Sequence, residues 1–245
     1  MGRLSESYFI KADKLLHNTP LHEYHIHTSY TDGENTAKEV VDESIRLGLK
    51  QIIFTEHTEP WFAKNKNWFG AYADEIVFFQ NKFKDIIEIK IGIETPAIDF
   101  LGNIEISEEM DTRCDYILGA AHRYPGLEGK RVQDLSANEA IELEFKTLMG
   151  LAGNKNIDAL AHIGGTCLKY CSEFPRSMMV EIIREATKNN IAIEINHQYH
   201  QPLQGIIDIC VQENASVVLG SNAHKLSEVG SVYRAIIECN ENKKG

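Results

Sequence analysis

The sequence lacks the features of a membrane-embedded or secreted protein. No apolar run reaches the roughly 18–20 residues that a transmembrane helix needs. The first seven residues, Met-Gly-Arg-Leu-Ser-Glu-Ser, do not combine a cationic start with an apolar core, so they do not resemble a signal peptide. Cysteine is scarce, with five scattered residues, and this odd number is typical of reduced thiols rather than of a disulfide framework. We therefore expect a cytoplasmic protein without a membrane segment.

Basic residues are also few. The sequence contains 25 Lys and Arg residues and 36 Asp and Glu residues, which gives a formal net charge of −11. This excess of acid argues against nucleic acid and anionic membranes as partners, because both require positive surface. The 245 residues are 43% hydrophobic and 25% charged, as in an ordinary globular protein. We expect one large domain over residues 1–245.

A regular pattern runs through the chain, in which short apolar runs rich in Ile and Val alternate with amphipathic segments. The predicted strands are 23–27, 51–55, 89–94, 116–120, 159–163, 192–196 and 217–221. The predicted helices are 37–47, 71–87, 138–151, 177–188, 203–212 and 229–239. Alternation of this kind predicts an α/β fold with a parallel sheet, either doubly wound or closed into a barrel. Periodicity does not decide between these two arrangements.

The histidines lie where the predicted strands end. Seven of the ten are found at or just beyond these ends: His25, His27, His57, His122, His162, His197 and His224. One such histidine is usually a hydrogen-bonded structural residue, but parallel strands bring all seven to one rim. Imidazoles and carboxylates together are ligands of zinc, manganese and iron. So many ligands exceed the needs of one tetrahedral ion, so we predict two or three divalent ions that share a bridging carboxylate.

Several short motifs occur in a fixed order: His-x-His-Thr-x-x-x-Asp-Gly at 25–33, Thr-Glu-His at 55–57, Gly-Ile-Glu at 92–94, His122, His162, Glu-Ile-Asn at 194–196 and Gly-Ser-Asn-Ala-His at 220–224. Together they resemble the polymerase-and-histidinol-phosphatase (PHP) family of metal-dependent phosphoesterases, most of all its histidinol-phosphatase-like and stand-alone phosphatase branches. The resemblance covers about residues 22–238. It implies a distorted, TIM-like (β/α)7 barrel with its active site at the C-terminal ends of the strands. Residues 1–21 would then form an N-terminal extension of a single barrel domain.

The resemblance also implies three metal ions of zinc, manganese or iron. The first would be held by His25, His27, Glu94 and Asn222, the second by Glu94, His122 and His162, and the third by Asp32, His57 and His224. Asn222 departs from the family, which usually has Asp at this position. A neutral amide oxygen is a weaker ligand than a carboxylate, so Asn222 either ligates adequately or marks an impaired or repurposed site. We favour adequate ligation because every other ligand position is intact.

The implied reaction is hydrolysis of a small phosphate monoester, with histidinol phosphate as one candidate, by a hydroxide that bridges two metal ions. No protein nucleophile is needed. Arg123 and Lys225, each directly after a predicted ligand, are candidates for binding the substrate phosphate. His197 is a candidate for facing the substrate or orienting a ligand. The aromatic segment from Pro60 to Phe69 is a candidate wall for the organic leaving group.

Three other functions stay open at this point. Members of the family also process nucleic acid ends, so an exonuclease or phosphodiesterase is one alternative, although the acidic balance disfavours a polymeric substrate. A non-catalytic or impaired metal-binding module is the second, because of Asn222. Hydrolysis of carbon–nitrogen or ester bonds is the third, since related barrels with clustered histidines perform it. The sequence decides neither the substrate nor the oligomeric state.

Overall fold

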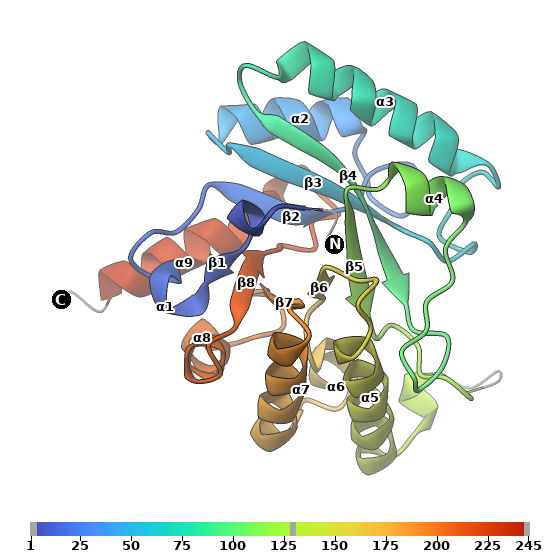
Figure 1. Cartoon of the computed structure of the whole chain (residues 1–245), viewed down its shortest axis with the longest axis vertical. Coiled ribbons are helices and arrows are strands. Elements are labelled where there is room, and N and C mark those ends of the chain that lie inside the picture. The colour runs from blue at the N-terminus through green and yellow to red at the C-terminus, as the bar shows by residue number, and fades with distance from the viewer. Residues whose placement is uncertain (1–3, 128–130, 243–245) are drawn as a thin grey trace.

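A computed structural model describes residues 4–127 and 131–242, so the outermost residues of the predicted domain, 1–3 and 243–245, lie outside the described residues. Within the described part of the chain, eight strands form one sheet that curls around a common axis, with the helices outside (Figure 1). The strands are β1 (Ile10–Lys11), β2 (His22–Ile26), β3 (Gln51–His57), β4 (Glu88–Pro96), β5 (Tyr116–Ala120), β6 (Ala159–Leu160), β7 (Ala192–Ile195) and β8 (Ser216–Leu219).

The order of the strands identifies the architecture. Strands β2 to β8 are parallel and follow one another across the sheet in chain order. The curl brings the two ends of this series together, because Ile26 at the end of β2 forms a parallel bridge with Ala223 beyond β8. Seven parallel strands in sequential order around a curled sheet confirm the predicted distorted, TIM-like barrel and exclude the doubly wound alternative.

The helices connect the strands and cover the outer face of the sheet (Figure 1). They are α1 (Ala12–Leu15), α2 (Ala37–Arg46), α3 (Trp68–Phe83), α4 (Glu108–Arg113), α5 (Ala137–Ala152), α6 (Gly165–Tyr170), α7 (Arg176–Lys188), α8 (Leu203–Gln212) and α9 (Ser231–Asn242). Short 3-10 helices are η1 (Glu6–Tyr8), η2 (Val132–Asp134) and η3 (Leu226–Glu228). Thr36 and Glu39 form a capping box at the start of α2, where the sequence S/T-x-x-E predicts one.

Most boundaries differ from the sequence prediction by one to three residues, but β6 is much shorter than the predicted strand 159–163. The chain leaves the extended conformation at His162, whose φ is 22°, and Gly164, at φ 75°, is the N-cap of α6. The short helices α1, α4 and α6 were not predicted, because a helix of one or two turns gives too little periodicity to detect.

The N-terminal segment closes the barrel at the end opposite to the histidines. Strand β1 pairs with β8 in antiparallel orientation, through Ile10 and Val217. Leu4 and Tyr8 join the buried cluster around Tyr24 that fills the barrel interior. Because this end is packed with apolar side chains, the open and polar end is the C-terminal rim of the strands. None of the helices among the described residues combines the length and apolarity needed to cross a bilayer.

Candidate metal centre

The strands deliver buried polar side chains to this rim. His25 and His27 are spaced by two residues at the end of β2, so their side chains point the same way. His57 is the last residue of β3 and Glu94 lies near the end of β4, directly opposite His57 in the strand register. All four residues are at most 5% exposed. Eight of the predicted ligands gather here: His25, His27, Asp32, His57, Glu94, His122, His162 and His224.

Glu94 is the centre of this arrangement. Its side chain is completely buried, and both carboxylate oxygens face imidazole nitrogens. Oε1 lies 3.0 Å from His122 Nε2 and 3.1 Å from His162 Nε2. Oε2 lies 3.1 Å from His57 Nδ1, 3.3 Å from His25 Nε2 and 3.4 Å from His27 Nε2. One carboxylate therefore faces five imidazoles that come from four different segments of the chain, because His25 and His27 share the end of β2.

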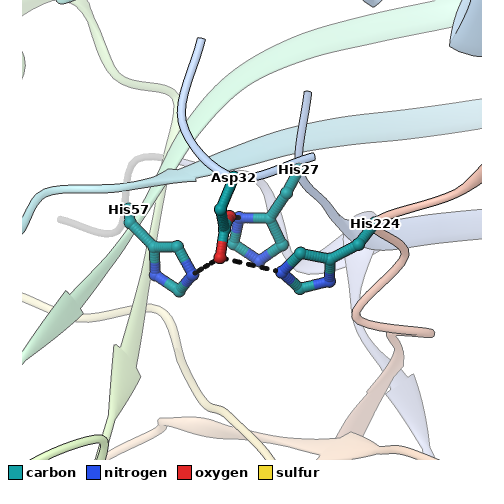
Figure 2. Close-up of side chains that lie close together, drawn as sticks. All are labelled: His27, Asp32, His57 and His224. Atoms are coloured by element: carbon teal, nitrogen blue, oxygen red, sulfur yellow. Dashed lines mark ion pairs between the residues drawn. The ribbon is translucent and has the colours of Figure 1, made fainter. Parts of the chain in front are cut away.

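Asp32 organises the outer part of the site (Figure 2). Its carboxylate lies between three imidazoles, with Oδ2 3.4 Å from His57 Nε2 and 3.3 Å from His224 Nε2, and Oδ1 3.9 Å from His27 Nδ1. Unlike Glu94, the Asp32 side chain is 31% exposed, so this part of the site opens toward solvent. The rings of His57 and His224 each stack on His27, with centroids 4.2 and 4.4 Å apart.

Three groups of side chains could each hold an ion. In each group the potential ligand atoms lie within 4.8 Å of one another. The groups are His27, Asp32, His57 and His224; His25, Glu94 and His162; and His57, Glu94 and His122. These groups differ in part from the sets that the family resemblance implies: His27 is grouped with Asp32 rather than with His25, and His162 is grouped with His25 rather than with His122. The implied partners His25 and His27 are nevertheless close, since their Nε2 atoms lie 3.1 Å apart.

The residues present fit divalent transition-metal ions. Five buried atoms of the site form no well-aligned hydrogen bond with the described residues, although some lie close to a facing group: His27 Nδ1, His57 Nδ1, Glu59 Oε2, Glu94 Oε2 and Asn222 Oδ1. Buried polar atoms are nearly always paired, so several nitrogen and oxygen atoms without a hydrogen bond at one place are suited to bind an ion. Imidazole nitrogens and carboxylate oxygens are the donors that zinc, manganese and iron accept.

The electrostatics of the site follow from this packing. Burial alone would raise the pKa of Glu94, but the facing imidazoles of His122 and His25 outweigh it and hold the pKa well below its usual range. Burial lowers the pKa of His27 well below its ordinary value, and the neighbouring charges of His57 and His224 act in the same direction. An ionised carboxylate and a neutral imidazole are the forms that bind metal.

Two further carboxylates orient the histidines from outside. Glu194 on β7 is buried, and its Oε1 lies 2.5 Å from His25 Nδ1, so that the opposite ring nitrogen, Nε2, is directed at Glu94. Glu59, which is 4% exposed, places Oε1 3.1 Å from His122 Nδ1 and Oε2 3.7 Å from His57 Nδ1. Carboxylates in this position fix the tautomer and orientation of metal-binding histidines. Sequence reasoning assigned no role to either residue, although Glu59 follows His57 by only two positions.

A buried carboxylate also shapes the loop that carries Asp32. Glu56 on β3 is completely buried and accepts hydrogen bonds from the Thr28 backbone N–H and from the hydroxyls of Thr28 and Thr31. Burial raises the pKa of Glu56 to about 7, although these hydrogen bonds act in the opposite direction. The loop that follows β2 is thereby tied to β3, which fixes the approach of Asp32 to the histidines.

Asn222 lies on the loop between β8 and η3, two residues before His224. Its backbone adopts the left-handed conformation with φ 51°, which Asn tolerates better than most residues, and its side chain is 9% exposed. The side-chain Nδ2 lies 3.4 Å from the hydroxyl of Tyr199, and the Tyr199 ring packs against His162 with centroids 5.0 Å apart. Tyr199 is thus a neighbour of the site that sequence reasoning did not identify.

The predicted substrate-binding residues lie outside the three groups. The Arg123 guanidinium is exposed and lies over the Trp61 ring, 4.0 Å from its centroid. Lys225 is exposed and pairs with Glu34 at 3.4 Å. His197 is partly buried, and the charges that act on its ring come from Arg234 and Glu228.

The aromatic segment divides between the site and the core. The Phe62 ring stacks on His57 with centroids 4.1 Å apart, and Trp61 is 55% exposed beside it. Trp68 and Phe69 instead begin α3 and are buried in the hydrophobic core. Only the first part of the segment therefore lines the rim.

A curled parallel sheet with clustered histidines and carboxylates at its C-terminal rim defines a barrel protein with a candidate multinuclear metal centre. Residues 23–198 match the family model of the PHP domain, and the chain belongs to this family. It is 25% identical over 219 residues to a "probable phosphatase" of Clostridium botulinum, an alignment that covers 86% of this chain and 82% of the relative. It is 28% identical over 193 residues to the histidinol-phosphatase of Lactococcus lactis, covering 71% of this chain and 70% of that one.

The fold has a counterpart among solved structures. The crystal structure of histidinol phosphate phosphatase from Lactococcus lactis, complexed with zinc, L-histidinol and phosphate, superposes with a TM-score of 0.64. The match covers 89% of this chain and 93% of that one at 21% identity. The likeness establishes that the two chains share the barrel fold.

Proposed function

We propose that this chain is a metal-dependent phosphatase that hydrolyses a small phosphate monoester. The observation that carries the proposal is the buried Glu94 carboxylate, which faces five imidazoles and belongs to two of the three groups that could hold an ion. Its curated relatives, which carry the names phosphatase and histidinol-phosphatase, support phosphate ester hydrolysis rather than another reaction of metal-containing barrels. Histidinol phosphate is the first substrate to test.

The ligands would be distributed over two or three ions. His27, Asp32, His57 and His224 would hold one ion, and Glu94 would be shared between the others, with His25 and His162 on one side and His57 and His122 on the other. Asn222 would contribute its Oδ1 as a neutral ligand. Zinc, manganese or iron bound here would lower the pKa of bound water toward neutrality and offset charge on the phosphoryl oxygens.

The chain's own residues contribute orientation and charge. Glu194 and Glu59 hold the rings of His25 and His122 in fixed tautomers. Burial would raise the pKa of Asp32, but the imidazoles of His224 and His57 lower it well below its ordinary value, so this carboxylate stays ionised. Arg123 and Lys225 would bind the substrate phosphate, since each directly follows a proposed ligand and both are exposed at this end of the barrel.

The proposal is tested by phosphate release from a panel of monoesters, which includes histidinol phosphate and an aryl phosphate, after loading with zinc or manganese. Wild-type protein should release phosphate, whereas His25→Ala and His57→Ala should each lose most of the activity. His17→Ala is the matched control, because His17 is exposed and lies outside the site. Absence of turnover with every monoester and metal, or preferred cleavage of diesters or amides, would overturn the proposal. Full activity of His57→Ala would exclude the arrangement with three ions.

A further inference from the structure

A tyrosine hydroxyl lies beside Asn222. Tyr199 Oη is 3.4 Å from Asn222 Nδ2, while Asn222 Oδ1 is buried without a hydrogen-bond partner among the described residues. The amide nitrogen can only donate, so the Tyr199 oxygen accepts in this contact. The phenolic hydrogen is then not used by Asn222 and is free for another acceptor.

The turn that carries Tyr199 is held firmly in place. Asn196 Oδ1 accepts from the Gln198 backbone N–H at 3.0 Å, and the buried His200 contacts the Ile163 carbonyl through Nε2 at 2.9 Å. Gln198 Nε2 also donates to the Ser221 carbonyl at 2.8 Å, which ties this turn to the loop of Asn222. Both sides of Tyr199 are therefore fixed to barrel elements.

The Tyr199 ring is directed toward the candidate metal centre. It packs against the His162 ring, whose Nε2 faces Glu94. A phenolic hydroxyl carries one hydrogen that it can donate, and here its oxygen already accepts from Asn222. The Tyr199 hydrogen is therefore available for an acceptor at the site.

We propose that Tyr199 is a substrate-positioning residue whose hydroxyl donates a hydrogen bond to a phosphoryl oxygen, and that Asn222 keeps this hydroxyl available by donating to its oxygen. The inference rests on the proposed function. It gives Asn222 a role of its own, because a carboxylate at this position accepts only and would draw the phenolic hydrogen to itself. Under this proposal the Asn222 amide contributes to substrate binding and does not indicate an impaired site.

The test is a double-mutant cycle read out by binding of inorganic phosphate to the metal-loaded protein, measured by calorimetry. Tyr199→Phe should weaken phosphate binding by about tenfold or more, because it removes one hydrogen bond to a charged group. Asn222→Asp should weaken binding by a similar factor in the wild type, and by a much smaller factor in the Tyr199→Phe background. Tyr233→Phe, on α9, is the matched control and should bind like the wild type.

Two further measurements make each outcome decisive. Metal content and thermal unfolding should be unchanged in Tyr199→Phe, since the ring that packs on His162 remains; a loss of either would assign Tyr199 a merely structural role. Equal phosphate binding in Tyr199→Phe and wild type, or equal effects of Asn222→Asp in both backgrounds, would overturn the inference alone. A wild-type protein that neither binds phosphate nor hydrolyses any monoester would overturn the proposed function as well.

Discussion

Replacement of Glu59 by Gln tests how the carboxylates around the histidines contribute to metal binding. Glu59 contacts two of the proposed ligands, His122 at 3.1 Å and His57 at 3.7 Å. Replacing a partner that orients a metal-binding histidine typically costs 10- to 100-fold in affinity. Because the contact with His122 is the shorter, we expect Glu59→Gln to weaken chiefly the ion held by His57, Glu94 and His122, by about 1.4–2.7 kcal/mol.

The assay is competition with a chromophoric chelator, which gives a stoichiometry and an affinity for each class of ion. Glu194→Gln should instead lower the affinity for the ion held by His25, because Glu194 Oε1 contacts His25 Nδ1 at 2.5 Å. Glu108→Gln, an exposed residue on α4, is the matched control. The reasoning fails if Glu59→Gln and Glu108→Gln bind metal alike, or if Glu59→Gln weakens every ion equally.

Two further predictions concern stability. His22 is 3% exposed, its Nε2 accepts from the Leu219 N–H at 2.9 Å, and burial lowers its pKa to about 3. Stability that depends on neutral His22 is present above the unfolded pKa of about 6.5 and is lost as pH falls toward 3, by up to about 1.4 kcal/mol per pH unit. The free energy of unfolding, measured with urea between pH 7 and 4, should fall less steeply in His22→Gln than in the wild type. The same pH dependence in both proteins would refute this. Gly220→Ala should lower the free energy of unfolding by about 1–3 kcal/mol, because its Cβ would lie 2.0 Å from Glu194 Oε1. Gly205→Ala, with open space around its Cβ on α8, should instead be neutral or stabilising in thermal unfolding, and an equal loss in both variants would contradict the argument.

The sequence predicts the barrel and its rim because both depend on local patterns. Strand and helix periodicities are visible in short windows, and the parallel order brings the strand ends together without knowledge of any single contact. His25, His57 and Glu94 therefore converge as expected once the strands are placed in chain order. The pattern predicts the barrel better than it predicts the length of a strand such as β6, where the positive φ of His162 ends the extended segment early.

The finer structure of the site depends on loops, which carry no periodicity. Tyr199 faces the centre because Asn196 and His200 fix its turn from two sides, and no spacing rule indicates this. His197, two residues earlier in the same segment, is instead influenced by charges on η3 and α9. Glu59 was missed for a similar reason, since its contact with His122 joins residues 63 positions apart.

The central claim is that Glu94 joins two ions of one metal centre, and the most direct test is the metal-to-protein ratio measured by inductively coupled plasma mass spectrometry. After saturation with zinc or manganese and removal of loose ions, the wild type and His17→Ala should both retain two or three ions per chain. Glu94→Ala should retain about one, held by His27, Asp32, His57 and His224. A wild type with one ion or fewer, or a Glu94→Ala variant that retains the wild-type number, would contradict the account.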